Sequence, residues 1–126
     1  MLDLDHFKKV NDTYGHPVGD MVLRQFADVL RRNLRRADLP ARVGGEEFNV
    51  ILVQSAPEAA LVAEKILRAV AEESFGELGD PFHITVSIGC ASWDSTMASA
   101  EALIKVADAA LYEAKDTGRN KVVVKS

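Results

Sequence analysis

The chain has 126 residues, of which 48% are hydrophobic and 27% are charged, and its formal net charge at pH 7 is −4. These values are typical of one soluble globular domain and exclude a disordered or fibrous protein, while the net negative charge argues against DNA as a partner. A single cysteine, Cys90, excludes an internal disulfide, and no apolar run is long enough to predict a membrane span in this segment, so we expect a cytoplasmic protein.

The first part of the chain predicts a strand followed by a long helix. Residues 1–5 alternate leucine with aspartate, which is typical of a strand with one apolar face. Apolar residues then recur at helical spacing within residues 16–38, and Pro17 stands where the first turn of a helix tolerates proline.

Two short apolar segments separated by glycines predict a β-hairpin. Residues 39–43 and 48–53 are the expected strands. Gly44 and Gly45 suit a two-residue turn between them because glycine tolerates positive φ. The second strand is apolar on both faces, which indicates an interior position in the sheet.

The second part of the chain predicts two more helices and two more strands. A helix over residues 55–73 begins with Ser55 and Glu58 at the spacing of a capping box. A turn-rich loop over residues 74–82 follows it. The remaining elements are a strand over residues 82–91, a helix over residues 99–115 and a strand over residues 121–125.

The order of these elements predicts an α/β (α+β) fold in a single domain over residues 1–126. The first six elements make a ferredoxin-like βαββαβ core, which has a mostly antiparallel sheet with helices on one side. An extra C-terminal helix and strand follow this core. The strand over residues 82–91 carries Ile84, Val86 and Ile88 on one face and only small residues on the other, which leaves room for a neighbour.

Acidic residues gather where the opening strand and the hairpin are expected to meet. Asp3 lies between two leucines, and an ionised carboxylate there is costly unless a cation meets it. If the opening strand pairs beside the hairpin, Asp3 and Glu46 converge at one end of the sheet, where their oxygens suit a hard divalent cation such as Mg²⁺. Because adjacent strand residues point to opposite faces, Glu46 and Glu47 need not have the same role: one could bind metal while the other accepts a proton. A solvated hairpin turn is the simpler interpretation of the sequence Gly-Gly-Glu-Glu.

Three separated motifs resemble those of the GGDEF domain, the diguanylate cyclase family. They are LDLDHFKKVNDTYGHPVGD at residues 2–20, RVGGEEF at residues 42–48 and ADAALYEAKDTGRNKVVV at residues 107–124, with Glu46 in place of the signature aspartate. The resemblance implies an enzyme that condenses two GTP molecules into cyclic di-GMP and two pyrophosphates as an antiparallel homodimer. It also implies that the usual N-terminal helical segment and the start of the first strand are absent here. Any sensory or receiver domain, or membrane tether, of the parent protein would precede them.

By matching position, the resemblance implies two Mg²⁺ or Mn²⁺ ions in each active site. Their ligands would be Asp3, Glu46, Glu47 and the backbone carbonyl of Leu4, and Glu47 would also assist loss of the proton of the ribose 3′-hydroxyl. Two ions can stabilise the nucleophile and the leaving pyrophosphate in an in-line attack on an α-phosphorus. We leave Asp5 outside this set and expect it to hold the end of the strand in place.

The resemblance also implies where GTP binds. Asn11 and Asp20 offer the donor and the acceptor that guanine requires, although a turn and a helix start are alternative roles for them. Core packing is the simpler interpretation of Leu23. For the isolated lysines, the simpler interpretation is a position on the solvated surface. The other implied contacts of the nucleotide are Phe7, Lys8, Leu23, Gly44, Gly45, Lys115 and Arg119.

Arg35 and Asp38 resemble the R-x-x-D site at which the family binds its own product. Arginine can pair with O6 and N7 of guanine while aspartate accepts hydrogen bonds from its Watson–Crick edge, so the resemblance implies feedback inhibition by the product. Lys65 or Arg68 is the candidate for a second basic contact. A surface ion pair at a helix end is the simpler interpretation of Arg35 and Asp38.

Two alternatives to the cyclase stay open at this point. One is a non-catalytic receptor that binds cyclic di-GMP through Arg35 and Asp38, and the other is a different nucleotidyl transferase on a similar fold. The truncated first strand further predicts that this segment alone has little activity, because few contacts would hold Asp3 near a chain end.

Overall fold

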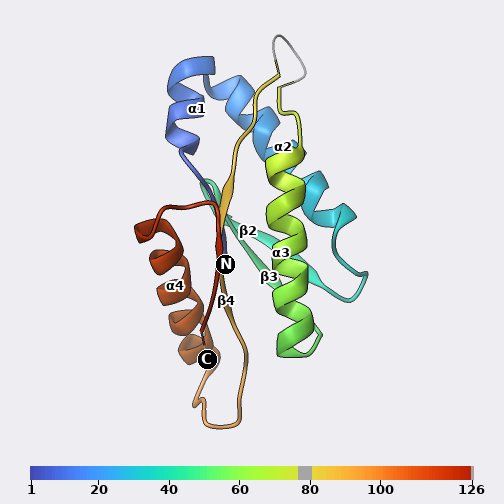
Figure 1. The fold of residues 1–126 in the computed structure, drawn as a ribbon, viewed down its shortest axis with the longest axis vertical. Helices are drawn as coiled ribbons and strands as arrows, with labels where there is room; N and C mark the ends of the chain where they lie inside the picture. The colour runs from blue at the N-terminus through green and yellow to red at the C-terminus, as the bar shows by residue number, and fades with distance from the viewer. Residues whose placement is uncertain (77–80, 126) are drawn as a thin grey trace.

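The computed structural model describes residues 1–76 and 81–125. These residues form a five-stranded sheet in the order β2-β3-β1-β4-β5, with four helices packed around it (Figure 1). The elements are β1 (Leu2–Leu4), α1 (Phe7–Tyr14), α2 (His16–Arg32), β2 (Leu39–Gly44), β3 (Glu47–Ile51), α3 (Ala56–Glu72), β4 (Val86–Ala91), α4 (Ala100–Asp116) and β5 (Val122–Lys125).

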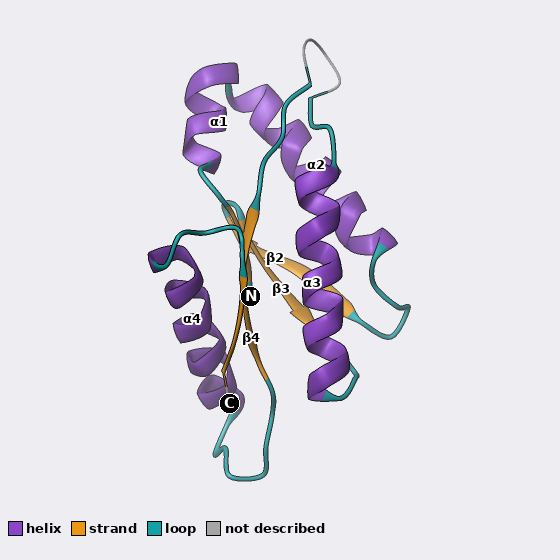
Figure 2. Ribbon diagram, in the orientation of Figure 1, coloured by secondary structure: helices purple, strands orange, loops and turns teal. Residues whose placement is uncertain are grey.

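The predicted fold class is confirmed by the topology of the sheet. All neighbouring strands are antiparallel except β4 and β5, and the order β2-β3-β1-β4 is that of a ferredoxin-like βαββαβ unit. Helices α2 and α3 lie on one side of the strands, whereas α4 lies on the other side (Figures 1 and 2). The extra helix and strand therefore extend the core, with β5 added parallel to β4.

One helix was missed by the sequence analysis. The sequence analysis predicts no helix or strand between residues 5 and 16, but Phe7–Tyr14 form the helix α1, which follows His6 in the left-handed region at φ 56°. Only Phe7 and Val10 of this helix are buried, and two apolar positions are too few to establish a helical period.

Two boundaries also differ from the prediction. Helix α2 ends at Arg32 because Asn33 interrupts it, and the side-chain amide of Asn33 donates to the carbonyl oxygen of Val29 at 2.7 Å. Strand β4 begins four residues later than predicted, since Phe82 instead forms an isolated antiparallel bridge with Phe75. The loop expected over residues 74–82 includes residues 77–80, which lie outside the described residues.

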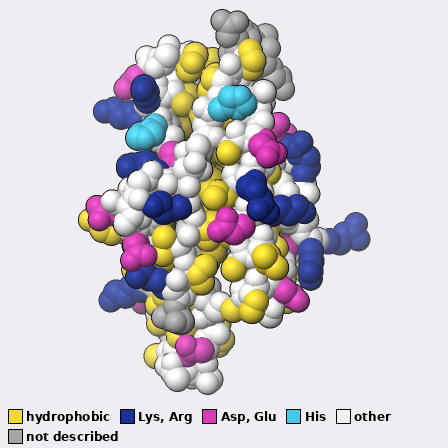
Figure 3. Space-filling model, in the orientation of Figure 1, with side chains coloured by type: hydrophobic (Ala, Val, Ile, Leu, Met, Phe, Trp, Pro, Cys, Tyr) yellow, Lys and Arg dark blue, Asp and Glu magenta, His cyan; other side chains and the backbone are white. Residues whose placement is uncertain are grey.

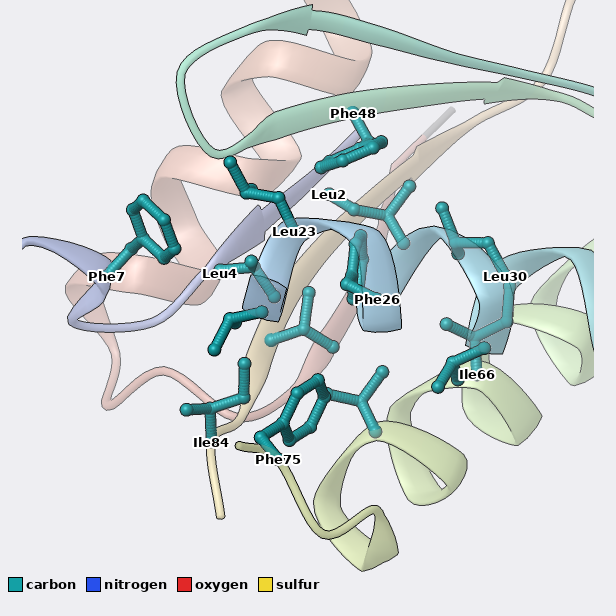
Figure 4. Close-up of a cluster of buried hydrophobic side chains, with 14 of the residues drawn as sticks. Leu2, Leu4, Phe7, Leu23, Phe26, Leu30, Phe48, Ile66, Phe75 and Ile84 are labelled. Atoms are coloured by element: carbon teal, nitrogen blue, oxygen red, sulfur yellow. The ribbon is translucent and has the colours of Figure 1, made fainter. Parts of the chain in front are cut away.

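The hydrophobic core lies between the sheet and helices α2 and α3. Phe26 of α2 is fully buried and meets Phe48 of β3 edge to face, with ring centroids 4.8 Å apart (Figure 4). Leu2 and Leu4 of β1 belong to the same cluster. Because side chains alternate along a strand, the burial of these leucines turns Asp3 toward the face that α4 covers.

The surface carries an apolar groove of about 540 Å³, which is lined by residues of β3, α3, β4 and α4. In Figure 3, hydrophobic side chains run down the middle of the visible face while lysine and arginine side chains gather at its flanks.

Asn49 and Gln54 each have a buried side-chain oxygen without a hydrogen-bond partner within the described residues. None of the helices described is long and apolar enough to cross a membrane.

Helix α4 packs directly against β4 at Gly89. A Cβ atom added at Gly89 would lie 2.2 Å from the backbone nitrogen of Leu111 and 2.5 Å from the carbonyl oxygen of Ala107. The face of β4 that carries small residues therefore leaves room for a neighbour, as predicted, and α4 occupies it.

We expect Gly89→Ala to lower the free energy of unfolding by about 3 kcal/mol, because the added methyl group meets helix backbone that cannot move away alone. Urea unfolding followed by circular dichroism measures this loss. Gly44→Ala is the matched control, since a Cβ atom there meets nothing within 4 Å. Equal stability of the two variants would contradict the close packing of α4.

Candidate functional site

Three acids lie together where β1 meets the β2–β3 hairpin. Asp3 of β1 is directly opposite Glu47 of β3, and residues opposite each other on antiparallel strands share a face of the sheet. Glu46 is in the adjoining turn, and its carbonyl oxygen accepts a hydrogen bond from the backbone N–H of Leu4 at 3.3 Å. We refer to Asp3, Glu46 and Glu47 as the acidic corner.

The hairpin turn is shifted by one residue from the prediction. Gly45 and Glu46 form the turn, with Gly45 at φ 50°, whereas Gly44 is the last residue of β2 and pairs with Glu47. Arg42 fixes the turn, because its Nε donates to the carbonyl oxygen of Gly45 at 2.8 Å. A Cβ atom added at either glycine would meet nothing within 4 Å, so the backbone of the turn is open to a ligand.

Lys115 of α4 supplies the positive charge beside Asp3. Its Nζ donates to Oδ2 of Asp3 at 2.6 Å, and the two side chains are 34% and 12% exposed. Burial raises the pKa of the Asp3 carboxyl above its usual range; Lys115 opposes this rise, while the charges of Glu46 and Asp5 add to it. Asp3 is therefore an anion that is costly to keep ionised without a cation next to it.

The chemistry of the acidic corner fits a hard divalent cation. Its donors are all oxygens, and a cation would offset the repulsion between neighbouring carboxylates. Within residues 1–76 and 81–125, no group of three or more His, Cys, Asp and Glu side chains is already arranged to hold an ion. Lys115 forms an ion pair with Asp3 instead, so binding of an ion requires these side chains to rearrange.

Asp5 connects three parts of the site. Its carboxylate accepts hydrogen bonds from Oγ1 of Thr85 and Oγ of Ser87, both at 2.6 Å, and from the backbone N–H of Asn120 at 3.1 Å. It thus ties β1 to β4 and to the loop after α4, where Arg119 and Asn120 have φ of 63° and 48°. The expected role of Asp5 in holding the end of the strand is confirmed.

The start of α1 presents free backbone donors. The N–H groups of Lys9 and Val10 donate to the carbonyl oxygen of His6 at 3.0 and 3.3 Å, whereas those of Phe7 and Lys8 have no partner among the described residues. Free N–H groups at a helix N-terminus favour an anion. The exposed side chain of Lys8 adds a positive charge at the same end.

Arg119 lies close to Lys115 at the other end of the site. Its backbone N–H donates to the carbonyl oxygen of Ala114 at 2.9 Å, and its guanidinium donates to that of Lys115 at 3.3 Å. The exposed Arg119 and the partly exposed Lys115 therefore lie at the C-terminal end of α4, which contacts β1 through Asp3.

The two residues expected to recognise guanine lie on neighbouring helices. Asn11 of α1 is half-buried and Asp20 of α2 is exposed, and neither side chain has a hydrogen bond within the described ranges. Asp20 and the buried Leu23 line a groove of about 490 Å³ between α2 and the β2–β3 hairpin. Three arginines that the sequence analysis did not single out line it as well, although helical spacing from Asp20 could have found the first two: Arg24, Arg31 and Arg42.

Arg35 and Asp38 are not the exposed pair at a helix end that the sequence suggested. Both follow the end of α2, and Asp38 is buried. Its carboxylate accepts hydrogen bonds from the backbone N–H of Arg35 at 2.8 Å, from that of Val53 at 3.3 Å and from the amide of Gln54 at 3.4 Å. The Arg35 side chain stays exposed, so Asp38 shapes the loop that presents it.

The two candidates for a second basic contact, Lys65 and Arg68, both lie on α3 with exposed side chains.

Comparison with known proteins gives consistent results. A family model described as "Diguanylate cyclase, GGDEF domain" matches residues 1–121. The chain is 45% identical over 125 residues to Diguanylate cyclase A of Treponema denticola, covering 98% of this chain and 34% of that protein. It is also 45% identical over 129 residues to Response regulator PleD of Caulobacter vibrioides, covering 100% of this chain and 28% of that protein. The chain thus spans about a third of the length of these relatives.

A solved structure shares the fold. The crystal structure of the GGDEF domain of DgcB from Caulobacter crescentus in complex with c-di-GMP aligns with a TM-score of 0.90 at 38% sequence identity. The alignment covers 98% of this chain and 74% of that chain.

We expect Lys115→Met to lower the unfolding free energy of the metal-free protein by about 1 kcal/mol at pH 7, because a mostly buried Asp3 carboxylate loses its cation. The pKa of Asp3 is raised in the folded state, so its proton binds more readily there than in the unfolded chain. The deficit should therefore shrink as the pH falls through that raised pKa and Asp3 becomes neutral.

Urea unfolding in the presence of EDTA at pH 7 and pH 4 measures this difference. Lys105→Met places the same substitution at an exposed position of the same helix and should change stability little at either pH. A deficit in Lys115→Met that is the same at both pH values would contradict the role of Lys115 as the counter-charge of Asp3.

Proposed function

Because the chain belongs to the diguanylate cyclase GGDEF domain family, we propose that the protein condenses two GTP molecules into cyclic di-GMP and two pyrophosphates. The observation that carries this proposal is the acidic corner, where Asp3 is directly opposite Glu47 and already bonded to a cationic side chain. An anionic site that recruits a cation, next to an open glycine turn, suits chemistry on a triphosphate.

Each of the two steps is an in-line substitution at phosphorus. The 3′-hydroxyl oxygen of one GTP attacks the α-phosphorus of the other and forms the new phosphodiester bond. The bond from the α-phosphorus to the bridging oxygen breaks, and pyrophosphate leaves with that electron pair. Glu47 takes up the proton of the 3′-hydroxyl as the general base.

Two Mg²⁺ or Mn²⁺ ions would be held by the acidic corner and by the backbone carbonyl of Leu4. When bound, they supply positive charge to the attacking and leaving oxygens. The residues of the chain then bind the rest of the triphosphate. The N–H groups of Phe7 and Lys8 and the open turn at Gly44 and Gly45 offer backbone donors, and the side chains of Lys8, Lys115 and Arg119 neutralise the phosphates.

Guanine is recognised by Asn11 and Asp20. Their side chains make no hydrogen bond to any of the described residues, so both can bind a ligand. Aspartate accepts from N1–H and the N2 amino group, and the asparagine amide donates to O6. Leu23 lines the groove beside Asp20 and supplies apolar contact for the base.

The reaction requires two copies of the domain. The described residues of one chain offer one acidic corner and one start of α1, hence one triphosphate site, while the product contains two nucleotides. A homodimer that brings two such sites face to face satisfies this requirement. We further place the domain in the cytoplasm, where GTP is available, under the control of a sensory or receiver domain in the parent protein, a proposal supported by a relative that is named a response regulator.

Product inhibition acts at the loop that follows α2. Arg35 is exposed and can pair bidentately with O6 and N7 of a guanine of cyclic di-GMP. Asp38 holds the shape of this loop through the backbone of Arg35 and Val53, and Lys65 or Arg68 adds a second positive charge.

We expect Glu47→Gln to lower the rate of cyclic di-GMP formation from GTP and Mg²⁺ at least about 100-fold, because the general base and a metal ligand are both lost. The reaction of the full-length protein is measured by chromatography of cyclic di-GMP and by a pyrophosphate assay, with two pyrophosphates expected for each cyclic di-GMP formed. Glu72→Gln, on the exposed surface of α3, is the matched control. A wild-type protein that binds cyclic di-GMP but forms none would support the receptor instead.

We expect Arg35→Ala to raise the product concentration needed for half inhibition more than tenfold while turnover is preserved, since hydrogen bonds to a charged group are lost at a site away from the acidic corner. Initial rates at increasing cyclic di-GMP measure this shift. Arg36→Ala, at the next exposed position, should be inhibited like the wild type. Unchanged inhibition of Arg35→Ala would count against this site.

A further inference from the structure

Gly19 is a glycine inside a helix without a conformational reason for it. It lies within α2 and lacks the positive φ that Gly15 has just before that helix. Glycine inside a helix is less favourable than alanine, because it loses more backbone entropy on folding. Its presence at this position therefore needs a different explanation.

The explanation lies in the contact between α1 and α2. A Cβ atom added at Gly19 would lie 1.9 Å from Oδ1 of Asn11 and 3.3 Å from Cζ of Phe7. Gly19 is buried, so the amide of Asn11 packs against the bare backbone of α2. Any side chain at position 19 must displace the Asn11 amide.

We propose that Gly19 determines nucleotide specificity by positioning Asn11 beside Asp20. The absence of a side chain at position 19 lets the end of the Asn11 side chain rest against α2, in a position from which its amide can donate to O6 of guanine. Gly19 directly precedes Asp20, so the same turn of helix both carries the acceptor and makes room for the donor. This inference rests on the proposed role of Asn11 and Asp20 in reading guanine.

The geometry separates this role from a role in stability. The atoms that a Cβ would meet most closely belong to the end of the Asn11 side chain, which can rotate away, and not to the backbone. Alanine also has the higher helix propensity. Gly19→Ala should therefore fold normally while its Asn11 amide leaves the position that guanine recognition requires.

The test is the ratio of GTP affinity to ATP affinity, measured by titration calorimetry on the full-length protein with Mg²⁺. We expect Gly19→Ala to lower this ratio about tenfold, the effect of one lost hydrogen bond to the base, and to unfold within a few degrees of the wild type. Val18→Ala, which removes core contact in the same turn without adding bulk, should lower the unfolding temperature and keep the wild-type ratio.

A double-mutant cycle with Asn11→Ala isolates the mechanism. If Gly19 acts only by making room for Asn11, then Gly19→Ala has no further effect on the ratio in the Asn11→Ala background. A wild-type ratio in Gly19→Ala, or a further loss in the double variant, overturns the proposal. Absence of any GTP preference in the wild type would instead remove the proposed function on which it rests.

Discussion

The central strand β1 sets the constraint on which the rest of the structure depends. Leu2 and Leu4 are buried in the core with residues of α2 and α3, whereas Asp3 and Asp5, the residue that follows the strand, are buried on the opposite face. Buried carboxylates must be paired or hydrogen-bonded, because desolvation of a charge is costly. The two aspartates differ in their partners: Asp5 accepts hydrogen bonds from the neutral hydroxyl groups of Thr85 and Ser87 and from a backbone N–H in the loop before β5, whereas Asp3 depends on one partly exposed lysine.

This difference separates the structural acid from the acid that is available for chemistry. Asp5 accepts three hydrogen bonds, from two hydroxyl groups and one backbone N–H, so its charge is stabilised without a cation. Asp3 pairs with the end of a flexible lysine side chain, and burial raises the pKa of its carboxyl group. The ionised form of Asp3 is therefore stabilised by any cation that binds next to it. The position of α4 follows from the same constraint, since Gly89 lets the helix approach β4 closely enough for Lys115 to reach Asp3.

The sequence predicts most of the fold because periodicity and alternation extend over many residues in α2, α3, α4 and β4. It does not predict α1, where only Phe7 and Val10 are apolar on the buried side. The sequence also does not predict the register of the hairpin, because Gly-Gly-Glu-Glu permits a turn at residues 44–45 or at residues 45–46. The observed turn at residues 45–46 places Glu47, not Glu46, opposite Asp3. The burial of Asp38 likewise depends on contacts with the distant Val53 and Gln54.

The pairing of Lys115 with Asp3 links the two halves of the proposed active site. A divalent ion bound to Asp3 places a second positive charge next to the ammonium group, and like charges at contact distance repel each other strongly in a partly buried site. Lys115 would then lose its partner, and in the proposed function the triphosphate of GTP is the anion that would replace Asp3. Binding of an ion to Asp3 would thus free Lys115 to bind phosphate, and binding of phosphate to Lys115 would in turn remove the cation that competes with the ion for Asp3. Coupling of this kind needs no movement of the sheet, only a change of partner by one side chain that is already 34% exposed.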